Sequence, residues 1–436
     1  MRDLVFLGFM LLSVFLAARN TFVSYLLWGW TGLIAINYYL YGFMAGIGYV
    51  QIYALITIVL IFARKNTNTQ KFKFDRTSVL MLIFLAHGFL SAVFSYPDLE
   101  SNWELFGNLV KTVLFCLFMP MIVVSRFRIH AFVLVIALAI SFHGVLDGLK
   151  FIASGGGHNA QPLKKFGDNN HLALILLMVL PFLYYLYQFS VKKIVSLGFL
   201  GALLLMVLAV VATHSRGALL GLFAVALWII VKSQKKILGI VLIALCALMV
   251  VQLAPDKWSQ RMETIQAADE DASLMARITA WKVSSAIAVA NPLLGGGFRA
   301  VQSHPVWNRF KDSPGLLGFV DTPTLNRSGV AAHSIWFEVL GDQGIVGLLL
   351  FIVLIVNVFM TRRDIWRLVK KNSLQSEWAG NLADMVAASI LAYVVSGSLL
   401  SAAYFELPYI CMMLMEAIKQ QQTRILQGDQ IKNLES

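Results

Sequence analysis

Residues 194–231 read IVSLGFLGALLLMVLAVVATHSRGALLGLFAVALWIIV and contain a single charged side chain, Arg216. Two apolar runs, 194–213 and 217–231, are separated only by His214, Ser215 and Arg216. A membrane-spanning helix needs about 20 mostly apolar residues, and its backbone groups must hydrogen-bond within the segment because hydrocarbon offers no partners. The pattern therefore predicts two transmembrane helices joined by a very tight turn.

The same pattern extends along most of the chain. Thirteen apolar runs lie between residues 4 and 418, although Arg19 and Asn20 separate the first two only weakly. The composition agrees, because 58% of residues are hydrophobic and 13% are charged, whereas a soluble domain has roughly 25% charged residues. We expect an all-α, polytopic membrane helix bundle with 12 or 13 transmembrane helices and one large helical loop outside the membrane.

The basic residues gather in short segments between apolar runs, and with alternating spans these segments share one side of the membrane. Lys and Arg in short loops mark the cytoplasmic side, so the net charge of +12 is an orientation signal and not a nucleic-acid signature. The C-terminus is expected on the same side. The clusters are Arg64/Lys65/Lys71/Lys73/Arg76, Arg126/Arg128, Lys192/Lys193, Lys232/Lys235/Lys236, Arg362/Arg363/Arg367/Lys370/Lys371 and Lys419/Arg424/Lys432.

One connection is far longer than the others. Residues 255–332 lie between two spans, on the side opposite the basic clusters, and are too rich in apolar residues for a disordered linker. Residues 273–290 have helical periodicity, Asn291 and Pro292 end that helix, and Gly295 to Gly297 predict a turn. The sequence therefore divides into N-terminal spans (1–254), an outer loop subdomain (255–332), and C-terminal spans with a cytoplasmic tail (333–436).

Polar side chains concentrate at this outer face, as an enzyme acting on a membrane-anchored substrate requires. Arg216 is the most informative, because a cation flanked by two apolar runs is expensive and suggests a function. Its simpler interpretation is an arginine that marks a helix end and reaches the interface. His214, Asn170 and Arg299 fall at the same face and are candidate substrate-binding residues.

His333 opens the last long apolar segment and is the candidate general base. A neutral imidazole accepts a proton from a hydroxyl near physiological pH, although a histidine here can also simply cap a helix. Arg261 and Arg277 are candidates for gripping diphosphate oxygens, or else they pair with nearby acids of the loop. Outer-face acids are scattered, so we expect neither a metal site nor a cofactor.

Several of these residues carry a family resemblance. Residues 261–298 read RMETIQAADEDASLMARITAWKVSSAIAVANPLLGGGF, residues 333–347 read HSIWFEVLGDQGIVG, and residues 214–221 read HSRGALLG. The order Arg, Ser-x-x-x-Arg-x-x-x-Trp, Pro-Leu-x-Gly-x-Gly and then His before Gly-x-x-Gly resembles the O-antigen ligase and polymerase superfamily. The first 20 residues, MRDLVFLGFMLLSVFLAARN, also resemble putative O-glycosylation ligases associated with exosortase systems.

The resemblance implies an inverting, metal-independent glycosyltransferase in a bacterial inner membrane, with its active site facing the periplasm. Its donor would be a glycan on undecaprenyl diphosphate. Its acceptor would be lipid A-core, as in lipopolysaccharide biosynthesis, a protein hydroxyl or the growing glycan itself. His333 would activate the acceptor hydroxyl, while Arg216, Arg261 and Arg277 would hold the diphosphate. No nucleic acid is expected as a partner.

Three alternatives remain open at this point. The first is a repeat-unit polymerase of the same superfamily. The second is a non-catalytic transporter of lipid-linked glycan, although transporters place polar residues near the bilayer midplane and often in repeated halves. The third is a non-catalytic scaffold for polysaccharide assembly. The polar residues crowd one face here, which favours the transferase.

Overall fold

The computed structural model describes residues 2–63, 69–97, 99–162, 167–232, 240, 272–322, 328–371 and 376–435. These residues form helices and connecting segments, and no strand occurs among them. The longer helices are α1 (Arg2–Arg19), α2 (Thr21–Ile34), α4 (Tyr49–Phe62), α5 (Arg76–Val93), α6 (Asn102–Ile122), α7 (Arg126–Ala153), α8 (Asn169–Phe189), α9 (Lys193–Ala212), α10 (Arg216–Lys232), α13 (Ala272–Ala290), α15 (Ile335–Lys371), α16 (Glu377–Gly397) and α17 (Glu406–Glu435). Short helices are η1 (Ile36–Tyr39), α3 (Gly42–Ala45), η4 (Ala300–Gln302), α14 (His304–Phe310) and η5 (Gly315–Leu317).

The predicted fold class, an all-helical polytopic membrane bundle, is confirmed. Within the described residues, seven helices (α5 to α9, α15 and α16) are long and apolar enough to cross a membrane. Three shorter apolar helices lie near the N-terminus, within α1, α2 and α4. The span expected at 237–254 falls almost wholly outside the described residues, so the count of 12 or 13 stays a prediction.

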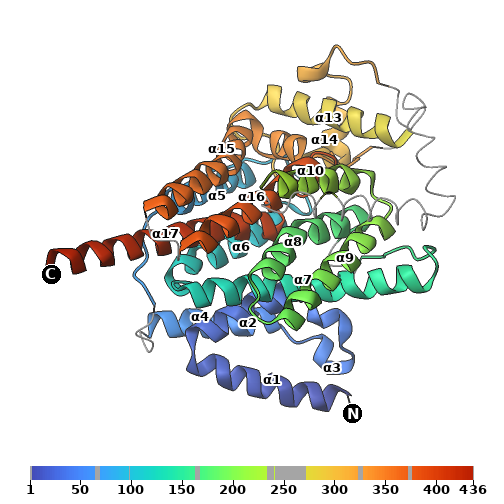
Figure 1. Ribbon diagram of the computed structural model, residues 1–436. Coiled ribbons are helices and arrows are strands. Elements are labelled where there is room, and N and C mark those ends of the chain that lie inside the picture. Colours follow the sequence, from blue (N-terminus) through green and yellow to red (C-terminus); the bar gives the residue numbers. More distant parts are fainter. Residues whose placement is uncertain are drawn as a thin grey trace.

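The long helices alternate in direction, which gives the bundle two chemically different ends (Figure 1). What we call the loop end holds the starts of α8, α10 and α15, together with the ends of α7, α9 and α16. What we call the basic end holds Arg76, Arg126, Lys193, Lys232 and Lys371, each at the first or last position of its helix. The polar candidates predicted above, other than Arg261, therefore lie away from the basic clusters.

Helices α8 and α16 form the centre of the bundle. In each of them, 78% of the apolar window is buried, and the two helices pack against each other. A helix that is apolar on all sides belongs inside a protein or a membrane, and α8 reads LALILLMVLPFLYYLYQF from residue 172. Its N-terminus therefore delivers Asp168 and His171 to the middle of the loop end.

The described residues of the segment 272–332 pack on one side of the bundle, with α13 and α14 in the upper part of Figure 1. The helix predicted for 273–290 is present as α13, and it ends at Ala290, directly before Asn291 and Pro292 as expected. The described residues of this segment have a small apolar core of their own, made by Ala280, Val283, Ala286, Ile287, Ala300, Val301, Val306, Trp307, Phe310 and Ala332.

Helix α15 is broken at Gly344, where φ is 71° and ψ is −169°. The break divides it into a short N-terminal half-helix, residues 335–343, and the long apolar helix that follows. The glycine-rich turn after α13 supplies the missing partners, since Gly296 N–H donates to Gly341 O and Gly297 N–H donates to Asp342 O, both at 2.9 Å. In return, Ile345 N–H donates to Pro292 O at 2.9 Å. The predicted turn thus fastens the half-helix to the end of α13.

Candidate active site

His333 lies at the start of the half-helix in an unusual backbone conformation. Its φ is +46°, in the left-handed region that non-glycine residues seldom adopt. The backbone N–H of His333 donates to Ser401 Oγ at 2.8 Å, which ties it to the turn between α16 and α17. Strained residues of this kind persist only where surrounding contacts hold them, and they cluster at functional sites.

Helix α13 is attached directly beside His333. The indole N–H of Trp281 donates to Ala332 O at 2.6 Å, and its ring stacks on Phe337 with centroids 5.0 Å apart and planes 7° from parallel. Arg277 precedes Trp281 by four residues and therefore lies on the same helix face, one turn earlier. The Trp281 contacts thus bring the Arg277 guanidinium to the neighbourhood of the His333 ring.

The His333 imidazole is suited to accept a proton. Burial lowers its pKa, and the positive charge of Arg277 lowers it further, which outweighs the opposite effect of Asp168. The ring is therefore neutral at neutral pH. Its Nδ1 atom is buried and has no hydrogen-bond partner within the described part of the chain, so the protein leaves the hydrogen-bonding capacity of this nitrogen unused.

A second histidine, His171, completes the polar cluster. Its Nδ1 faces Asp168 Oδ1 at 3.0 Å, and its Nε2 faces Ser401 O at 2.8 Å. Both partners are acceptors, so the doubly protonated ring satisfies both contacts as a donor. Burial would raise the pKa of Asp168, but hydrogen bonds from His171 outweigh burial and lower that pKa. The pair fixes a cation beside the His333 ring.

Glu338 also binds the turn between α16 and α17. It is buried on the half-helix, and its Oε2 accepts the backbone N–H of Ala403 at 2.8 Å. The turn 401–403 is therefore bound by His333, His171 and Glu338, which come from two distant parts of the sequence. This arrangement holds the two histidines in a fixed relation.

The tight turn 213–215 reaches the same region. His214 has a φ of +55°, and Arg216 is the first residue of α10 and is half-buried. Asn169, which follows Asp168, donates through Nδ2 to Thr213 O at 2.8 Å. Asn170 lies on the first turn of α8, where its backbone N–H donates to Asp168 Oδ1 at 2.9 Å.

Two predicted residues remain, Arg299 and Arg261. Arg299 is exposed, and its guanidinium donates to Ser101 Oγ at 3.3 Å, so it is directed toward the start of α6. Arg261 lies outside the described residues. Among the residues that are described, no three His, Cys, Asp or Glu side chains lie close enough together to hold a metal ion.

Comparison with known families bears on this site. Residues 201–352 match the O-antigen ligase family. Residues 1–190 match a second family model, described as a family of unknown function (DUF5935). Comparison of the whole sequence with curated proteins gave no significant match. The first match supports the O-antigen ligase superfamily, and with it a ligase- or polymerase-type glycosyltransferase in a membrane.

The O-antigen ligase match contains only part of the candidate site. Arg216, Arg277, Arg299 and His333 lie inside it. His171 lies within the segment that matches the family of unknown function, and Ser401 lies beyond both. The two histidines that share the turn 401–403 therefore come from different family segments.

Asp168 and His171 are not among the candidate residues selected from the sequence. The signal was available, because an acid three residues before a histidine at a helix start predicts an N-cap that also binds the ring. Ser401 and Glu338 carry no comparable signal. Their roles depend on how α15 and the turn after α16 meet in space.

Proposed function

We propose that this protein is an inverting, metal-independent glycosyltransferase that moves a glycan from undecaprenyl diphosphate to an acceptor hydroxyl. The observation that carries the proposal is His333, a neutral imidazole with an unpartnered nitrogen beside the cations Arg277 and His171. A base next to a cluster of positive charges suits a reaction in which a hydroxyl loses a proton while a diphosphate leaves.

The chemical step is a single displacement. The acceptor oxygen attacks the anomeric carbon from the face opposite the diphosphate, and its proton passes to His333. The bond between the anomeric carbon and the phosphate oxygen breaks, and the electron pair stays on that oxygen. Because one bond forms as the other breaks on the opposite face, the anomeric configuration inverts.

Positive charge around the base stabilises the leaving group. Arg277 and Arg216 are assigned to the diphosphate oxygens, because a guanidinium keeps its charge and binds phosphate bidentately. Arg261 is assigned the same role from the sequence alone. His171, held by Asp168, adds a cation that the sequence analysis had not selected. Asn170, His214 and Arg299 are retained as substrate-binding candidates.

The orientation of the protein in the membrane is inferred from the distribution of its Lys and Arg residues. The basic end is assigned to the cytoplasm by the rule that Lys and Arg in short loops stay inside. The loop end, with His333, then faces the periplasm of a bacterial inner membrane. This orientation suits a donor delivered to the outer leaflet.

The ligase is our primary proposal, and a repeat-unit polymerase is the alternative in the same superfamily. The two differ in the acceptor, which is lipid A-core or a protein for a ligase and the growing glycan for a polymerase. The resemblance of residues 1–20 to exosortase-associated O-glycosylation ligases favours a protein acceptor. Each of the three acceptors can be supplied separately to purified protein. The acceptor that receives glycan then distinguishes a ligase from a polymerase.

The decisive test compares cells that carry His333→Ala, Arg277→Gln, Arg216→Ala or wild-type protein at matched membrane levels. Lipid-linked donor and transferred glycan are followed together. A general base contributes about 100-fold or more to a rate, so the His333→Ala cells should accumulate donor and lose transferred glycan. His304→Ala is the matched control, because His304 is an exposed histidine of the same loop and binds Ser328 Oγ at 2.6 Å.

The other outcomes identify the competing functions. Normal transfer by His333→Ala would remove the proposed base and favour a transporter. Normal transfer by both Arg277→Gln and Arg216→Ala would indicate a scaffold, since a catalytic site that loses its diphosphate contacts leaves buried charge unpaired.

A further inference from the structure

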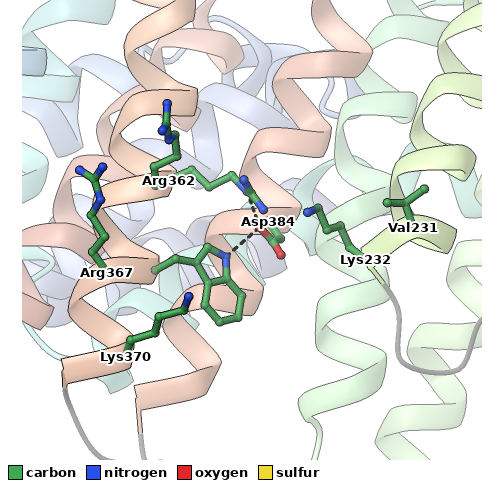
Figure 2. A pocket seen from close by; sticks show the side chains of 8 residues that line it. Val231, Lys232, Arg362, Arg367, Lys370 and Asp384 are labelled. Carbon is green, nitrogen blue, oxygen red and sulfur yellow. Dashed lines mark hydrogen bonds and ion pairs between the residues drawn. The ribbon is translucent and has the colours of Figure 1, made fainter.

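A second polar site lies at the basic end of the bundle, far along the same helices from His333. A cavity of about 490 Å³ opens between the ends of α10 and α15 and the start of α16 (Figure 2). Ligand sites usually measure about 300–1,000 Å³, so its size is that of a small-molecule site. The lining residues are Val231, Lys232, Arg362, Arg363, Trp366, Arg367, Lys370 and Asp384.

The lining is strongly cationic. Five of its eight residues are Lys or Arg, and Asp384 is the single acid among them. Asp384 is already engaged, since it forms an ion pair with Arg362 and its Oδ1 accepts the indole N–H of Trp366 at 3.0 Å. Arg367 donates to Asp364 Oδ1 at 3.3 Å, so the surplus of positive charge in the cavity comes from Lys232, Arg363 and Lys370.

The centre of this site is fixed in place. Only 7% of the Asp384 side chain is exposed, against 17% for Arg362. The Arg362 guanidinium also lies 5.3 Å from the ring of Trp228, whose indole N–H donates to Asp384 O at 3.0 Å. A basic segment that served only to orient the chain would need Lys and Arg near a span end. It would not need two tryptophans and a buried acid to set an arginine in a cavity.

The position of the cavity along α15 indicates which layer of the bilayer lies beside it. The roughly 18 residues from Gly344 to Arg362 rise about 27 Å along α15 at 1.5 Å per residue. The hydrocarbon core of a bilayer is about 30 Å thick. If the break at Gly344 lies near one boundary of that core, Arg362 lies near the other, at the level of the lipid headgroups.

We propose that this cavity binds a phosphate-bearing anion at the basic end of the protein, either a lipid headgroup or a soluble phosphate. Basic pockets between transmembrane helices suit anionic headgroups, and Arg and Lys bind phosphate oxygens through charge-assisted hydrogen bonds. The site lies at the opposite end of the helices from His333 and takes no part in the proposed glycosyl transfer.

The test uses the purified full-length protein in zwitterionic detergent. Calorimetric titrations are run with dioctanoyl phosphatidylglycerol, with dioctanoyl phosphatidylcholine and with inorganic phosphate. The pocket variant is Arg363→Gln combined with Lys370→Gln, since both side chains are exposed and neither holds the Arg362–Asp384 pair. The matched control is Lys192→Gln combined with Lys193→Gln, which removes the same charge at the same end.

A basic residue near an anionic headgroup contributes a factor of about five in affinity, so the pocket variant should bind phosphatidylglycerol about 30-fold more weakly. The control should bind as wild type does, and phosphatidylcholine should bind to none of the three proteins. Specific loss of inorganic phosphate binding, without lipid binding, would support the site and identify a soluble ligand. Absence of anion binding by wild-type protein, or an equal loss in both variants, would overturn the proposal.

Discussion

Ser401 offers the sharpest test of how the proposed base is held. Replacement by alanine removes the hydroxyl that accepts the His333 backbone N–H at 2.8 Å, and it leaves the Ser401 carbonyl that His171 contacts unchanged. An N–H that loses its partner in a partly buried place costs about 1–3 kcal/mol. That bond also holds His333 in its left-handed conformation, which itself costs about 1–3 kcal/mol.

This free-energy cost corresponds to a decrease in the rate of glycan transfer. If the left-handed conformer of His333 becomes less populated by about 1–3 kcal/mol, transfer should fall by about 5- to 150-fold. Ser401 is a positioning residue, so the pH dependence of the remaining activity should match that of the wild type. Ser401→Thr restores a hydroxyl at the same place and should recover most of the activity.

The assay measures initial rates of glycan transfer by purified protein, with pH profiles for each variant. Ser398→Ala is the matched control, because it removes a hydroxyl from the same turn, one that accepts the Trp336 indole N–H at 2.8 Å and not the N–H of His333. A Ser401→Ala rate within twofold of wild type would refute the reasoning. It would mean that the Trp281 bond to Ala332 alone maintains the His333 conformation.

Three further predictions address the base, the fold and the ion requirement. Because the positive charge of Arg277 helps to lower the pKa of His333, Arg277→Gln should raise that pKa and move the acidic limb of the residual rate to higher pH. An acidic limb at the wild-type pH would show that Arg277 does not influence the pKa of His333. Gly344→Ala should lower stability by about 1–3 kcal/mol from backbone strain alone, seen as a fall in thermal midpoint. Gly107→Ala on α6, where an added Cβ meets no atom within 4 Å, should not. Transfer should continue unchanged in EDTA, and a rate restored only by added Mg²⁺ would contradict the metal-independent mechanism.

Apolar patterning was enough to predict the fold class and the end of the bundle at which the polar residues gather. A run of about 20 apolar residues has few alternatives to a helix when the solvent is hydrocarbon. The helix at 272–290 and the turn after it followed from periodicity and from glycine. The pattern of spans placed Arg277 and His333 at the same face, and the family resemblance assigned them to one reaction, although 55 residues separate them in sequence.

The contacts between distant segments could not be read from the sequence. His143 contacts the Tyr39 hydroxyl and Ile34 O, and Asp147 contacts His158 Nε2 at 3.0 Å. Local spacing allows a pair, but tertiary packing decides which partner is nearer. The contacts of Ser401 and Glu338 could not be predicted for the same reason, because they form only where α15 packs against the turn after α16.

The break in α15 explains why two glycine motifs about 50 residues apart depend on each other. Breaking a helix near a membrane exposes carbonyls that have no water to bind, here those of Gly341 and Asp342. The turn after α13 can satisfy them only by close approach, because a Cβ at Gly295 would lie 2.5 Å from Gly344 N and one at Gly344 would lie 2.6 Å from Pro292 O. The same approach anchors one end of α13, while Trp281 anchors its middle to Ala332. Arg277 and His333 are therefore carried by two segments fastened together at two points, which would keep the proposed cation and the proposed base in a fixed relation.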